Sequence, residues 1–245
     1  MRGKTDTIRR WKCQACGKTV SERKFTPLYR LKTAPSRIGL VMFLLANGLD
    51  PSAAAHVFRH DHRTIRRWLT RGGKHAAALH DLYFRRLRCA FLQLDELVAT
   101  TRGEEHFTFV WSAVDAVTKI IPQIHVGRRM ITDAYTFAHG LKARTKALGF
   151  SGQVQTAFAE RANLTLRELI APLARRAWSI ARSQDSLLGA IHWGVCSYHF
   201  IRPHASLQAS SAYPRTPAMA ADLTDHIWTP QDVLHYKIRI IAMHS

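Results

Sequence analysis

The sequence is poor in acidic residues, in cysteine and in long apolar runs. It contains 17 Asp and Glu against 36 Lys and Arg, which gives a net charge of +19. A surface this positive repels itself unless a polyanion is bound, and nucleic acid is the commonest polyanion in cells. A ribosomal-type or merely soluble basic protein would carry the same excess, so charge alone leaves these interpretations open.

The scarcity of cysteine and of apolar runs restricts the class of protein further. Four unevenly spaced cysteines do not form a disulfide scaffold, which favours a reducing, cytoplasmic compartment. The longest apolar run extends from Ile38 to Ala46, about half the length that a membrane-spanning helix needs. The first residues lack the layout of a signal peptide. We therefore expect a cytoplasmic protein without a membrane span.

Changes in residue pattern divide the chain into four segments. Residues 1–33 are basic and contain a pair of cysteines, and residues 34–90 have the periodicity of helices. Residues 91–208 begin with segments of alternating polarity, which is typical of strands. Residues 209–245 form a C-terminal tail. We expect three strands over 91–99, 106–114 and 120–126 as an antiparallel meander, then helices over about 132–147, 155–171 and 184–200. This order predicts an α+β fold.

Two short helices are predicted between Asp50 and Arg71. Asp50 followed by Pro51 is a strong signal for a helix start, and a turn of three residues separates this helix from a second one over about 62–69. The spacing is that of a helix-turn-helix, whose second helix enters the major groove of DNA. An ordinary helical hairpin with a solvated basic face is the alternative. The candidate DNA-contacting residues are Arg63, Thr64, Arg66 and Arg67.

The cysteine pair has the spacing of one zinc knuckle. Cys13 and Cys16 are followed by Gly17, and a structural zinc site needs about four ligands. Only two ligands are present in this region, so the pattern indicates half of a zinc site. We expect Cys89 and Cys196 to lie in helical segments as small core residues.

Two carboxylates suggest a divalent metal site. Asp95 is predicted in the middle of a strand, where aspartate is disfavoured, and its neighbour Glu96 must point to the opposite face. Glu160 opens a predicted helix in which positions 160, 163 and 167 share one polar face. Metal-dependent nucleases bring carboxylates from separate elements to magnesium. A solvated helix face with spaced charges is the simpler alternative for Glu160.

The order of several segments resembles a known family. The segments are RWKCQACGKTVSE, the predicted helix-turn-helix, LQLDEL, AVDAVTKIIP, TAFAERANLTLRE, HFIRPHASL and TPAMAADLTDHIWT. Together they cover nearly the whole chain and resemble the DDE transposases of bacterial insertion sequences, in particular the IS-one-like group. The first segment looks like the second zinc knuckle of that group.

The resemblance implies an RNase H-like domain that nicks DNA at the ends of an element and joins the freed strand to a target. Magnesium or manganese ions held by two aspartates and a glutamate activate water in such enzymes. Asp95 matches the first aspartate, Glu160 the glutamate, and Arg167 the basic residue that follows seven positions later. The implied partners are double-stranded DNA with terminal inverted repeats and a second chain, either a copy or a full-length transposase.

The chain departs from the family at the second aspartate. The family carries a motif like Thr-Ser-Asp-Gly on a strand before the glutamate helix, and no such motif lies between residues 141 and 160. Asp115 and Asp133 are the nearest candidates, but a turn and a helix start give each a structural role. The chain thus resembles an N-terminally shortened and internally deleted transposase with impaired catalysis. A non-catalytic DNA-binding inhibitor of transposition and a pseudogene product are the alternatives.

Overall fold

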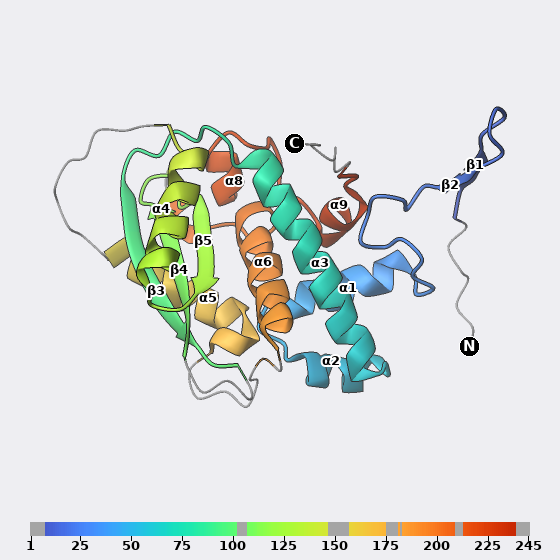
Figure 1. Ribbon diagram of the computed structural model, residues 1–245, viewed down its shortest axis with the longest axis horizontal. Coiled ribbons are helices and arrows are strands. Elements are labelled where there is room, and N and C mark those ends of the chain that lie inside the picture. Colours follow the sequence, from blue (N-terminus) through green and yellow to red (C-terminus); the bar gives the residue numbers. More distant parts are fainter. Residues whose placement is uncertain are drawn as a thin grey trace.

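The computed structural model describes residues 8–101, 107–146, 157–174, 181, 183–208 and 213–238. The fold is a mixture of helices and two antiparallel sheets, one of two strands and one of three (Figure 1). Within these ranges, none of the helices combines the length and the apolar character needed to cross a bilayer.

Three helices follow one another in the N-terminal half: α1 (Pro35–Leu45), α2 (Pro51–Phe58) and α3 (His62–Tyr83). α1 ends shortly before Gly48, which has a positive φ of 84° that a glycine adopts without strain. The Asp50 carboxylate accepts hydrogen bonds from the backbone N–H groups of Ser52 and Ala53, at 2.7 and 3.2 Å. The predicted cap and limits of α2 are therefore confirmed.

The third helix is much longer than predicted. The sequence pattern placed its end near Leu69, but α3 continues to Tyr83 through Gly72 and Gly73. Glycine weakens an isolated helix by about 1 kcal/mol relative to alanine. Here it lets α3 approach α6 (Gln184–Phe200) closely, since a Cβ on Gly73 would lie 2.3 Å from the carbonyl oxygen of Gly189. The packing of the two helices therefore extends α3.

The three-stranded sheet has the order β3 (Leu92–Ala99), β4 (Thr108–Asp115) and β5 (Gln123–Gly127), with both pairs antiparallel. The predicted meander is confirmed, although the third strand begins after Pro122 rather than at Ile120. α4 (Ile131–Arg144) packs on one face, where Phe137 meets Trp111 of β4. α5 (Ala157–Leu169) packs on the other face against β3 and β4 (Figure 1).

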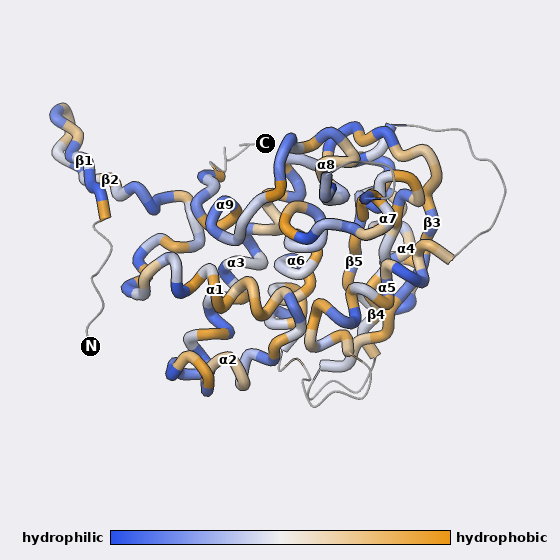
Figure 2. The backbone as a smooth tube through the Cα atoms, turned by 180° about the vertical axis from the view of Figure 1, so that it is seen from behind, coloured by the Kyte–Doolittle hydropathy of each residue, from blue (hydrophilic) through white to orange (hydrophobic). Residues whose placement is uncertain are grey.

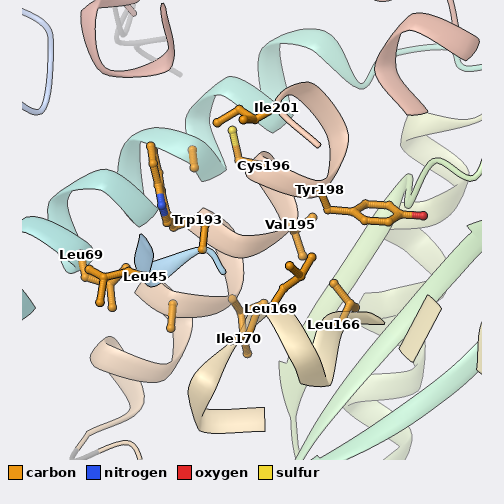
Figure 3. Close-up of a cluster of buried hydrophobic side chains, with 14 of the residues drawn as sticks. Leu45, Leu69, Leu166, Leu169, Ile170, Trp193, Val195, Cys196, Tyr198 and Ile201 are labelled. Carbon is orange, nitrogen blue, oxygen red and sulfur yellow. The ribbon is translucent and has the colours of Figure 1, made fainter. Parts of the chain in front are cut away.

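One cluster of buried side chains contains residues from both the N-terminal helices and the sheet domain. The indole N–H of Trp193 on α6 donates a hydrogen bond to the carbonyl oxygen of Met42 on α1, at 2.7 Å. Figure 3 shows part of the cluster, in which Leu169 and Ile170 lie beside Val195 of α6. The expected boundary near residue 90 is thus crossed by a continuous core.

The C-terminal part consists of short helices. α5 ends at Leu169, shortly before Pro172, and the 3-10 helix η1 (Ala171–Leu173) follows. α7 (Ala205–Gln208), α8 (Pro217–Ala220) and α9 (Pro230–His235) form the rest, and Thr229 caps α9. α9 packs against α1, where Gln231 donates a hydrogen bond to the Pro35 carbonyl oxygen at 2.9 Å.

The two-stranded sheet is an exposed hairpin of β1 (Arg10–Lys12) and β2 (Thr19–Ser21). Both views show it standing away from the rest of the molecule, at the end opposite the three-stranded sheet (Figures 1 and 2). In Figure 2 most of the apolar stretches of the chain lie in the main body and few lie in this hairpin.

Candidate functional site

The first turns of α3 place the four candidate DNA-contacting residues at or near the surface. Arg63 and Arg67 are exposed, whereas Thr64 and Arg66 are half-buried. The Arg66 guanidinium lies 3.5 Å from the hydroxyl oxygen of Ser52 on α2. The apolar residues among and after them are all buried: Ile65, Trp68 and Leu69.

The turn between α2 and α3 fixes how the two helices meet. Arg59 ends α2 in the left-handed conformation, with φ 53° and ψ 48°. Asp61 then caps α3, and its carboxylate accepts a hydrogen bond from the Arg63 backbone N–H at 2.7 Å. Arg37 of α1 donates to the Phe58 carbonyl oxygen at 2.7 Å. These contacts hold the basic start of α3 in a fixed orientation against α1 and α2.

Asp95 lies in the middle of β3 and faces α5. Its carboxylate accepts a hydrogen bond from the side-chain amide of Asn163, at 2.5 Å, and from the backbone N–H of Glu96, at 2.8 Å. Ser112 on β4 donates to the Asn163 side-chain oxygen at 3.1 Å. Asn163 is 2% exposed, so its amide holds the carboxylate of Asp95 in a single direction.

The start of α5 is attached to the same strand. The Gln93 side-chain oxygen accepts hydrogen bonds from the backbone N–H groups of Phe158 and Ala159, at 2.9 and 3.0 Å. Two residues of strand span about 7 Å, which matches the axial distance along α5 from this cap to Asn163. Glu160 is exposed and lies between the two attachment points. The structure therefore joins Asp95 to α5 through Asn163, with Glu160 three residues earlier on the same helix.

Asn163 and Gln93 contact the candidate site but were not predicted from the sequence. Asn163 was grouped with Glu160 and Arg167 on a polar face, yet it is buried and contacts Asp95 directly. The spacing of three residues after Glu160 is the signal that could have identified it, because residues three apart are neighbours on a helix. No comparable local signal marks Gln93.

The other carboxylates of the sheet have separate partners. Glu96 points to the opposite face from Asp95, as predicted, and forms an ion pair with Arg129 at 2.5 Å. Asp115 is fully buried, and its carboxylate accepts hydrogen bonds from the backbone N–H groups of Phe91 and Thr118, at 2.9 and 2.8 Å. The predicted turn at Asp115 is thereby confirmed.

Asp133 lies in the first turn of α4, two residues after the helix begins. Its carboxylate contacts Nε2 of His125 at 2.8 Å and accepts a hydrogen bond from the Arg128 backbone N–H at 3.1 Å. Both contacts hold the end of β5 to the start of α4. Asp133 therefore has a structural role away from α5, on the opposite face of the sheet.

The chain after α4 returns beside the segment that leads into β3. The Leu87 backbone N–H donates to the Arg144 carbonyl oxygen at 2.8 Å, and the Lys146 N–H donates to the Leu87 carbonyl oxygen at 2.9 Å. The two segments run parallel. Residues 147–156, where the second aspartate of the family was sought, lie outside the described residues and contain no Asp or Glu in sequence.

The cysteine pair forms the turn of the exposed hairpin. The Cys13 backbone N–H donates to the Lys18 carbonyl oxygen at 2.8 Å, and the Gly17 N–H donates to the Cys13 carbonyl oxygen at 2.9 Å. Hydrogen bonds from the backbone N–H of Cys16, from its thiol and from the N–H of Ala15 lower the pKa of the Cys13 thiol. In the part of the chain that is described, no third His, Cys, Asp or Glu joins this pair.

The other two cysteines are core residues, as predicted. Cys196 lies in α6, but Cys89 lies in the connection between α3 and β3 and not in a helix, which corrects the expected helical setting. Burial raises the pKa of both thiols to about 12. Neither side chain is a candidate ligand for the hairpin, because both are enclosed in the main body.

Two chemical capabilities follow from these arrangements. The start of α3 can contact an anionic duplex, and the contact between β3 and α5 can present carboxylate oxygens to a divalent ion. Comparisons with protein-family models, curated proteins and solved structures found no match for this chain. The arrangement of the residues is therefore the basis for a functional conclusion.

Proposed function

We propose that this chain is a transposase-like protein that binds double-stranded DNA through the helix-turn-helix of α2 and α3. The observation that carries the proposal is the capped start of α3, which exposes Arg63 and Arg67 while three apolar neighbours are buried. This is the division of faces that a recognition helix needs, and the net charge of +19 favours an anionic partner.

In this proposal the first two turns of α3 enter the major groove. Arg63 and Arg67 are four residues apart and therefore lie on the same side of the helix. Arginine binds phosphate or guanine through two parallel N–H groups, and Thr64 can contact either base edges or phosphate. α2 would cross the backbone, as the first helix of such a pair does.

The proposal extends to an RNase H-like domain with metal-dependent DNA nicking. An antiparallel meander, a helix, a parallel bridge beside the segment that leads into β3 and a helix packed on β3 support this arrangement. Asp95 and Glu160 come from separate elements and would hold a magnesium or manganese ion, with water molecules as further ligands. The bound ion would polarise a phosphodiester and lower the pKa of a water ligand.

The residues around the carboxylates have distinct parts in this chemistry. Asn163 orients Asp95, and Ser112 orients Asn163 through the bond to its side-chain oxygen. Arg167 lies one turn beyond Asn163 on the same side of α5, where its guanidinium would hold a phosphate.

A second candidate function is binding without catalysis, in which the chain occupies the inverted repeats of an element and blocks a full-length transposase. The engagement of Asp115 and Asp133 in structural hydrogen bonds favours it. Two carboxylates provide too few anionic oxygens to hold two divalent ions tightly. A pseudogene product without function is the third possibility.

In this proposal the exposed hairpin of β1 and β2 contacts a second chain in an oligomer. Cys13 and Cys16 provide two of the four ligands of a structural zinc ion. A second chain, either another copy or a full-length transposase, would supply the remaining ligands.

One experiment distinguishes the candidates. The purified chain is mixed with a duplex that carries the inverted repeats flanking its own gene, and binding is followed by gel shift and nicking by denaturing gels in Mg²⁺ or Mn²⁺. Metal-dependent nicking that Asp95→Ala abolishes supports the transposase. A shift without nicking in either metal contradicts catalysis and supports the inhibitor. If the chain neither binds the duplex nor unfolds cooperatively, the result supports a pseudogene product without function.

A further inference from the structure

Four basic residues that are distant in sequence lie together at the start of α5. Lys119 belongs to the turn between β4 and β5, Arg161 to the first turns of α5, and Arg202 and His204 to the connection after α6. Arg161 and Arg202 are exposed, and the other two are half-buried. We call Lys119, Arg161, Arg202 and His204 the α5 basic cluster.

Contacts between the three elements fix the cluster. The ammonium group of Lys119 lies 3.8 Å from the centre of the Phe158 ring, and Phe158 is three residues before Arg161 on the same side of α5. The Tyr198 hydroxyl donates a hydrogen bond to the Lys119 carbonyl oxygen at 2.8 Å. The Tyr198 ring also meets the ring of His204, with centres 6.0 Å apart. Tyr198 of α6 thus connects the turn to the segment that carries His204.

The cluster is strongly positive. Burial lowers the pKa of His204, and the positive charges of Lys119, Arg161 and Arg202 lower it further. No carboxylate in the described ranges lies within ion-pair distance of any of the four residues, although the negative charge of Asp115 acts to raise the pKa of Lys119. Lys119 also has a left-handed backbone, with φ 62°, a conformation that costs energy for a residue other than glycine. A bound anion would relieve the mutual repulsion of the three charged groups, Lys119, Arg161 and Arg202.

The cluster flanks the candidate metal ligands. At 100° per residue, Arg167 lies about 20° from Glu160 around α5, whereas Phe158 lies about 160° from it. Arg161, the cluster member on α5, directly follows Glu160 and lies about 100° from it around the helix. The α5 basic cluster is therefore beside Glu160 at the first turn of the same helix. A sugar–phosphate backbone that crosses the start of α5 would meet the cluster first and the carboxylates next.

We propose that the α5 basic cluster is a second DNA-binding site, which holds the phosphodiester backbone of a duplex on the sheet domain. The ligand is the sugar–phosphate backbone and not the base edges. The cluster does not present a helix that could enter a groove, and positive charge alone binds phosphate independently of base sequence. The inference rests on the proposed function. It adds a second DNA contact to the one proposed on α3. This second contact lies on the part of the protein that carries Asp95 and Glu160.

The test compares three double variants of the full chain on one duplex between 50 and 200 mM salt. Arg161→Ala with Arg202→Ala removes the two exposed members of the cluster. Arg128→Ala with Lys142→Ala removes equal charge from exposed positions near α4 and is the matched control. Arg63→Ala with Arg67→Ala removes the predicted contacts of α3. Binding is measured by gel shift, and protected nucleotides are mapped by hydroxyl-radical footprinting.

We expect the slope of log affinity against log salt to fall by roughly 0.9 for each phosphate that the variant no longer neutralises. The cluster variant should have a shallower slope and no protection in one part of the footprint, whereas the control pair should keep the slope and footprint of the parent chain. Lys119→Gln, which removes the charge and keeps most of the side chain, should change the slope in the same direction.

Each outcome decides between the two proposals. If the cluster variants keep the parent slope and footprint while the α3 variant changes both, the second site is overturned and the proposed function stands. An equal change in the control pair shows an effect of net charge alone and also overturns the site. If the parent chain does not bind the duplex at all, the proposed function fails and the second site fails with it.

Discussion

The two halves of α3 have opposite environments. In the first half, Arg63 and Arg67 are exposed and the helix contacts α2. In the second half, Gly73 meets the backbone of α6, and His75 and His80 contact carbonyl oxygens of α9 and of the residues before β5. One continuous helix therefore carries both the surface proposed to contact DNA and the main attachment to the sheet domain.

This difference shows how the proposed DNA-binding surface and the candidate metal site can be held in a fixed position relative to each other. A recognition helix joined to a separate domain by a flexible linker would let that domain move freely relative to bound DNA. Here the second half of α3 packs along α6, and Ile170 after α5 packs against Gly194 of α6. A duplex bound at α3, as proposed, would therefore be held in a fixed position relative to Asp95 by these packed helices.

The largest effect is expected from Gly73→Ala. A Cβ at this position would lie 2.3 and 2.4 Å from the carbonyl oxygen and Cα of Gly189, and backbone atoms cannot move aside cheaply. We expect a decrease of about 3 kcal/mol in the free energy of unfolding, measured by urea denaturation. Gly72→Ala is the matched control, since its Cβ would come closest to the flexible end of Met42.

The control should be nearly neutral, because the higher helix propensity of alanine, about 1 kcal/mol, offsets a small shift of Met42. Equal decreases for the two variants would show that the close approach of α3 to α6 does not determine stability.

A smaller effect, about 2 kcal/mol for each histidine between pH 6.5 and pH 5, is expected from acid. Burial lowers the pKa of His80 to about 3, with a further contribution from Arg144, and burial holds the pKa of His199 well below its usual value. Both histidines contact the backbone of Ile121, so they join α3 and α6 to the sheet domain. They stay neutral in the folded protein, whereas the unfolded chain takes up protons below about pH 6.5.

Stability from these histidines is therefore complete above about pH 6.5 and decreases as the pH falls towards 3. Each proton taken up only by the unfolded chain contributes about 1.4 kcal/mol per pH unit. Urea midpoints at pH 7, 6 and 5 measure the slope. His80→Gln should reduce it, and His235→Gln, at an exposed position, should not. An unchanged slope in His80→Gln would show that this histidine does not titrate with folding.

Local sequence signals were sufficient for much of the fold. Asp50 with Pro51 predicted the start of α2, and alternation of polarity predicted the meander, because caps and strand faces depend on residues close in sequence. The second half of α3 could not be predicted in this way. Its glycines are unfavourable in a helix until α6 packs against them.

The same distinction applies to the site. Asp95 was identified because aspartate is unusual inside a strand, and Glu160 because of its place on a helix face. The hydrogen bond between Asp95 and Asn163 joins residues 68 positions apart, so only the packing of α5 on β3 reveals it. Residues of the α5 basic cluster are likewise brought together by three elements and have no shared motif.

The smallest effect on stability is expected from Arg63→Ala with Arg67→Ala, in the exposed half of α3. Neither side chain is buried, so the free energy of unfolding should change by less than about 0.5 kcal/mol. DNA affinity should nevertheless decrease, and its salt slope should fall by roughly 0.9 for each phosphate that is no longer neutralised. Gly73→Ala should change stability, and the two arginine substitutions should change DNA affinity. The two measurements should therefore distinguish the roles of the two halves of α3. A decrease in stability as large as that of Gly73→Ala would mean that the arginines hold the fold, and the exposed half of α3 would then not be a recognition surface.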